Sequence, residues 1–137
     1  MECLDNVYKR LIIDNIELID YRILNTDAVT IQLDDTYGIF VDYHGFKTLG
    51  EEFVTLAHEY GHCISGATHK LCSPYDLIEQ HENRANRAAV HEFLPCSEIL
   101  NAIEQGYTEV WQIAEYLDIP DEFVILAIEI YTAEQRL

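Results

Sequence analysis

The residues with the clearest chemical potential in this chain are two histidines and a glutamate, His58, Glu59 and His62. On a helix, side chains four residues apart leave the same face about one turn apart. His58 and His62 can therefore offer two imidazole nitrogens to one Zn²⁺ at about 2.0–2.1 Å. Glu59 lies beside the first ligand, where its carboxylate can accept a proton from a water bound to the metal. This spacing is typical of zinc proteases, although so short a pattern also occurs by chance.

A zinc ion held in this way needs a third protein ligand. In one known arrangement it is a histidine six residues after the second, but that position holds Thr68, and His69 comes one residue late. The other arrangement uses a glutamate from a second helix. Residues 79–95 are rich in helix formers and end at a proline, so they predict such a helix, with Glu82 as its candidate ligand.

The predicted second helix places five side chains on one face, and these are Glu82, Ala85, Asn86, Ala89 and Phe93. Because alanine is small, this face can pack closely against the first helix and the metal. Asn86 lies one turn after Glu82 and can hydrogen-bond the far nitrogen of a ligand histidine. The first helix is predicted from apolar residues at three- and four-residue steps, namely Phe53, Leu56, Ala57 and Tyr60.

The chain contains the motifs His58-Glu59-x-x-His62 and Glu82-x-x-Ala85-Asn86, followed by the dipeptide Leu94-Pro95. In these features it resembles the ImmA/IrrE family of metallopeptidases. The two motifs together are far more specific than either alone. The similar region covers roughly residues 28 to 131, which is most of the chain. Members often carry Leu where this chain has Tyr60, a difference that does not touch the chemistry.

The resemblance implies an α+β, gluzincin-like fold: a compact zincin-like metallopeptidase domain with a small sheet beside the motif helix. It implies one Zn²⁺ per chain on His58, His62 and Glu82, with water in the fourth position and Glu59 as the general base. The implied activity is that of a zinc-dependent endopeptidase. By the same resemblance, the substrate would be a DNA-binding repressor whose cleavage derepresses genes of a phage, a mobile element or a stress regulon.

Residue patterns predict the elements around the motif. Residues 3–19 predict an opening helix, whose end at residues 16–19 either extends it or forms a short strand. Residues 28–33 alternate as a half-buried strand does, and residues 37–43 predict its hairpin partner, with 39–42 as an edge strand. An edge strand beside the motif helix would accept an extended peptide.

The stretch from 65 to 74 lacks periodicity and predicts a loop between the two ligand helices. His69 within it is open to three interpretations: a substitute ligand, a substrate contact or a plain surface residue. No residue is assigned to hold the oxyanion, and Tyr75 and His69 are the candidates.

The net charge of −17, from 8 basic and 25 acidic residues, argues against a nucleic-acid partner, because binding phosphates relies on Lys and Arg. It is compatible with a basic protein partner such as a repressor, or with an acidic surface that only aids solubility. The pattern of residues 106–131 is similar to a helix–turn–helix. Its second helix, however, carries Asp121, Glu122 and Glu129 and no basic residue, which does not suit contact with DNA. We expect these helices to close the core.

Length and composition favour a single domain over residues 1–137, with residues 98–137 as a helical tail packed on the core. The absence of a long apolar stretch or signal-peptide start predicts a cytoplasmic protein without a membrane partner. Four cysteines without paired spacing predict reduced, buried thiols, and they are Cys3, Cys63, Cys72 and Cys96. Two rival functions remain, a non-catalytic protein that binds a regulator and a helix–turn–helix transcription factor.

Overall fold

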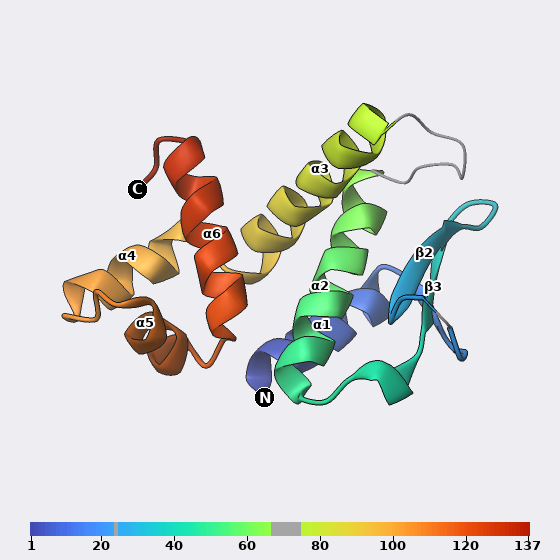
Figure 1. Ribbon diagram of the computed structural model, residues 1–137, viewed down its shortest axis with the longest axis horizontal. Helices are drawn as coiled ribbons and strands as arrows, with labels where there is room; N and C mark the ends of the chain where they lie inside the picture. The colour runs from blue at the N-terminus through green and yellow to red at the C-terminus, as the bar shows by residue number, and fades with distance from the viewer. Residues whose placement is uncertain (24, 67–74) are drawn as a thin grey trace.

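The computed structural model describes residues 1–23, 25–66 and 75–137, and this part of the chain forms six α-helices and a three-stranded sheet (Figure 1). The mixture confirms the predicted α+β class. In chain order the elements are α1 (Glu2–Ile13), β1 (Glu17–Asp20), β2 (Ala28–Gln32), β3 (Tyr37–Val41), the 3₁₀ helix η1 (Tyr43–Gly45), α2 (Leu49–Ser65), α3 (Tyr75–Phe93), α4 (Cys96–Glu104), α5 (Val110–Leu117) and α6 (Asp121–Ala133).

Helix α2 begins and ends at residues suited to those positions. The Thr48 side chain accepts a hydrogen bond from the Glu51 backbone N–H, which satisfies one of the free donors of the first turn. Gly66 ends the helix in the left-handed conformation, with φ of 65°. The face predicted to be buried is buried, because each of its four apolar residues is 0 % exposed, and they are Phe53, Leu56, Ala57 and Tyr60.

Helix α3 is the main packing partner of α2. The two backbones approach closely where Gly61 of α2 faces Ala85 of α3, since a Cβ on Gly61 would lie 2.1 Å from the Ala85 carbonyl oxygen. Ala85 and Ala89 are buried, as expected for the face predicted to meet the motif helix. Small residues on both helices thus bring the two predicted ligand-bearing segments together.

The strand order in the sheet is β1-β3-β2, with β3 parallel to β1 and antiparallel to β2. The hairpin predicted for β2 and β3 is confirmed. The prediction of residues 39–42 as an edge strand is wrong, because β1 pairs with the far side of β3 and makes it central. The opening helix ends at Ile13, and Glu17–Asp20 forms a strand, which is the second of the two alternatives predicted for residues 16–19.

The C-terminal helices α4, α5 and α6 lie beyond α3, on the side away from the sheet (Figure 1). Phe123 of α6 packs edge-to-face on Phe53 of α2, with ring centroids 4.9 Å apart. The Tyr131 hydroxyl donates to the Leu94 carbonyl oxygen at 2.8 Å, which ties the end of α6 to the end of α3. None of the helices in the described part of the chain combines the length and apolar character needed to cross a bilayer.

Candidate metal centre and catalytic cleft

Three side chains predicted to bind metal converge in the structure. The Nε2 atoms of His58 and His62 lie 3.1 Å apart, and the Glu82 carboxylate lies 2.6 Å from the first and 3.1 Å from the second. Within the described residues, these three form a group whose ligand atoms all lie within 4.8 Å of one another. Helix α2 supplies the two histidines one turn apart, and α3 supplies the glutamate across the tight helix pair.

The donor atoms fit a small tetrahedral cation. Ligands at about 2.0–2.1 Å around a tetrahedral Zn²⁺ would be separated by about 3.3–3.4 Å. The observed separations of 2.6–3.1 Å are slightly shorter, so a small outward movement of the side chains would accommodate the ion. Two imidazoles and one carboxylate are also the donor set of catalytic zinc sites that leave a fourth position open.

Asn86 forms a hydrogen bond with His58 on the side of the ring opposite the candidate metal-binding nitrogen. Its Oδ1 lies 2.7 Å from the Nδ1 of His58. An amide oxygen only accepts hydrogen bonds, so Nδ1 is the donor of this contact, which leaves Nε2 as the ring nitrogen that can bind a metal. This contact orients the imidazole toward the group formed with Glu82, which is the role predicted for Asn86.

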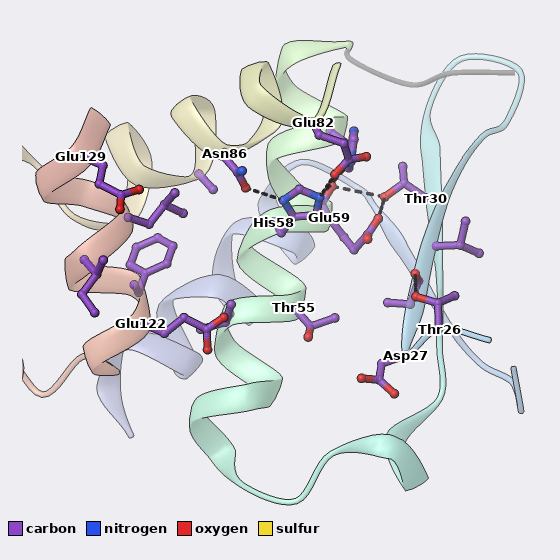
Figure 2. Close-up of a pocket in the computed structure, with 18 residues that line it drawn as sticks. Thr26, Asp27, Thr30, Thr55, His58, Glu59, Glu82, Asn86, Glu122 and Glu129 are labelled. Carbon is purple, nitrogen blue, oxygen red and sulfur yellow. Dashed lines mark hydrogen bonds and ion pairs between the residues drawn. The ribbon is translucent and has the colours of Figure 1, made fainter. Parts of the chain in front are cut away.

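Glu59 extends from α2 toward the sheet, where β2 meets it (Figure 2). The Thr30 hydroxyl donates to the Glu59 carboxylate at 2.5 Å and also lies 3.3 Å from the Glu59 carbonyl oxygen. Glu59 is 9 % exposed, and burial raises the pKa of its carboxyl above the ordinary value, while the Thr30 hydroxyl acts in the opposite direction. A buried carboxylate fixed in this way is suited to accept a proton.

The side chains of His58, Glu59, His62 and Glu82 face a cleft with a volume of about 740 Å³. One wall is β2 with the turn before it, the floor is α2, and α3 and α6 form the other side (Figure 2). His62 is buried, whereas the side chains of His58 and Glu82 are 25 % and 38 % exposed. The donor group is therefore open to the cleft on one side, where a substrate could approach it.

The sequence raised four further candidates for the site, which are His69, Cys72, Tyr75 and Cys63. His69 and Cys72 lie outside the described residues, and Tyr75 begins α3 with a side chain that is not described. Cys63 is buried, and burial raises the pKa of its thiol to about 12, so it is protonated and stands apart from the metal-compatible group.

Two features of the cleft were missed by reasoning from the sequence. Thr30 was placed only in a strand, and its partner Glu59 lies 29 residues away. The alternation of β2 was the available signal, because it puts Ala28 and Thr30 on the same face. The second feature is α6, which lines the cleft with Glu122 and Glu129. Comparison of the chain with protein-family models, curated proteins and solved structures found no match.

Proposed function

We propose that the protein is a zinc-dependent endopeptidase with a zincin-like fold. The observation that carries this proposal is the convergence of His58, His62 and Glu82 on one cleft, with the Glu59 carboxylate beside them. A helix bearing two ligands, a second helix bearing a carboxylate ligand and a strand along the cleft form an arrangement suited to peptide hydrolysis.

Zn²⁺ bound by these three side chains would act as a Lewis acid and lower the pKa of water to about 7. Glu59 then accepts the proton of the attacking water and passes it to the leaving amine. Thr30 holds the Glu59 carboxylate in place, and Asn86 fixes the ring of His58. In the described sheet β2 pairs only with β3, so its other edge is available to an extended peptide lying in the cleft.

We further propose that the substrate is a helix–turn–helix repressor, whose cleavage derepresses phage, mobile-element or stress genes. The support is the resemblance of the two motifs to the ImmA/IrrE family and the charge of −17, which favours encounter with a basic partner. The acidic residues of α6 favour a partner other than DNA, because they would repel its phosphates.

The test is incubation of the zinc-loaded protein with the repressor encoded beside its gene, followed by mass spectrometry of the fragments. We expect cleavage at a discrete site. The Glu59→Gln variant should keep its fold and its zinc but cut roughly 10²–10⁴ times more slowly, because it lacks the base. Glu104→Gln, on the exposed end of α4, is the matched control and should cut at the wild-type rate.

Cleavage by Glu59→Gln at the wild-type rate would contradict the assigned base. An intact repressor with zinc bound, even after addition of cellular extract, would favour another substrate or a protein that binds its regulator without cutting it.

A further inference from the structure

The wall of the cleft formed by α6 carries a pair of acidic residues. Glu122 and Glu129 both line the cleft and project from α6 on the side of α2 (Figure 2). Seven residues apart on a helix, they lie about two turns or 10.5 Å from each other along one side. Ile125 and Leu126 line the cleft between them. This side of α6 therefore presents an acidic, an apolar and a second acidic position in sequence.

Among the described residues, the ionisable carboxylates of the cleft are not matched by basic side chains. The described part of the lining holds five acidic residues and no lysine or arginine, and the acidic ones are Asp27, Glu59, Glu82, Glu122 and Glu129. Glu122 and Glu129 are exposed, and no ion pair within the described ranges 1–23, 25–66 and 75–137 neutralises either of them. Both carboxylates are thus available to a cationic group that enters the cleft.

The buried face of α6 does not include this acidic pair, although Glu122 also suits the first turn of the helix. The helix is anchored by a different set of side chains, which are all buried and comprise Phe123, Val124, Ala127 and Tyr131. Ile125, between the glutamates, is 46 % exposed, and Val29 on the β2 wall is 43 % exposed. Exposed apolar groups flanked by carboxylates suit a ligand that is itself apolar at its centre and cationic at its flanks.

We propose that Glu122 and Glu129 determine specificity by selecting peptide segments in which Lys or Arg flanks an apolar residue. This inference rests on the proposed function, because it places the segment across the donor group of His58, His62 and Glu82. The distance between the two glutamates corresponds to about three residues of extended chain. Within the cleft, the carboxylates would form charge-assisted hydrogen bonds with ammonium or guanidinium groups.

The experiment measures binding, so that it does not depend on catalysis. The full-length Glu59→Gln protein, loaded with zinc, is titrated with fluorescent peptides that share an apolar centre and carry Lys, Gln or Glu at the flanks. The same titrations are repeated with a variant of this protein that also carries Glu122→Gln and Glu129→Gln. The matched control adds Glu104→Gln and Glu115→Gln, which change the net charge equally at exposed positions outside the cleft.

We expect the Lys peptide to bind more tightly than the Gln peptide, and the Glu peptide more weakly. The ratio of Lys-peptide to Gln-peptide affinity should fall roughly threefold to tenfold in the α6 double variant, as for the loss of two partly exposed ion pairs. It should change little in the control. An equal fall in both double variants would overturn the proposal, since the preference would then come from net charge alone.

Absence of any preference for the Lys peptide in the parent protein would likewise overturn the proposal. The proposed peptidase activity fails on a different result, which is the absence of cleavage of all these peptides and of the repressor by zinc-loaded protein with Glu59 intact. A preference for basic peptides that depends on Glu122 and Glu129 would support the binding inference even then.

Discussion

At the scale of single residues, the chemistry of the site depends on side chains that are each held by a second residue. Asn86 orients His58 from α3, and Thr30 holds Glu59 from β2. The motif on α2 places its own donors one turn apart, but it does not fix the direction of the Glu59 carboxylate. In the proposed reaction, Thr30 would therefore be a positioning residue that acts through Glu59.

Removing the Thr30 hydroxyl should slow catalysis without weakening substrate binding. A hydrogen bond to a charged group contributes about 1.5–3 kcal/mol, so Thr30→Val is expected to lower kcat roughly tenfold to a hundredfold with little change in KM. Thr30→Ser keeps the hydroxyl and should recover most of the rate. The measurement is steady-state kinetics on a peptide substrate, with unfolding curves to compare stability.

A merely structural role for Thr30 predicts another pattern. In that case Thr30→Ser, which loses a methyl group, would be no more active than Thr30→Val, and loss of rate would follow loss of stability. That pattern, or a Thr30→Val enzyme with wild-type kcat, would contradict the assignment.

At the scale of elements, the two helices that carry the candidate metal ligands were predictable because their signals are local. The spacing of Phe53, Leu56 and Tyr60 defines a buried face from neighbouring residues alone. The same holds for Glu82 and Asn86 on α3, whose shared face follows from helical periodicity. Their convergence with the histidines requires only that two helices with small residues pack face to face.

The strand order and the walls of the cleft could not be derived in this way. Pairing of β1 with β3 joins segments about twenty residues apart and depends on how the chain returns, which alternation of side chains does not reveal. Likewise, α6 reaches the cleft through the contact of Phe123 with Phe53, across 70 positions of the chain. Only the tertiary structure relates such distant residues.

The close approach of α2 and α3 makes Gly61 a sensitive position. In Gly61→Ala the new Cβ would meet the Ala85 carbonyl oxygen at 2.1 Å, so the helices must separate. We expect a loss of about 1–3 kcal/mol in the free energy of unfolding, as for overpacking in a core, and weaker zinc binding because Glu82 moves away from the histidines. Urea unfolding and zinc titration measure the two effects.

Gly50→Ala provides the matched control in the same helix. Gly50 lies at the start of α2, and its Cβ would meet the side-chain ring of Pro120, the residue before α6, at 3.3 Å. Because Ala favours helix over Gly, we expect its stability to change by less than about 1 kcal/mol and its zinc affinity to be retained. Equal stability of the Gly61→Ala and Gly50→Ala proteins would show that the helix pair tolerates a wider spacing.

At the scale of the whole molecule, the cleft lies between parts of the chain that are distant in sequence. The sheet and α2 come from the first half, whereas α3 and α6 come from the second (Figure 1). The donor group lies where these halves meet, with His58 and His62 on one side and Glu82 on the other. Metal bound there would cross-link the halves, so binding should also stabilise the fold.

The zinc content of the purified protein and its variants tests the central claim most directly. After purification with zinc available and gel filtration, elemental analysis should find close to one zinc per chain. His62→Ala and Glu82→Gln should lose it, whereas His91→Ala, which changes an exposed histidine paired with Glu134, should retain it. Full zinc content in Glu82→Gln, together with its loss in His69→Ala, would reassign the third ligand. A wild-type protein that binds no zinc would contradict the metal centre itself.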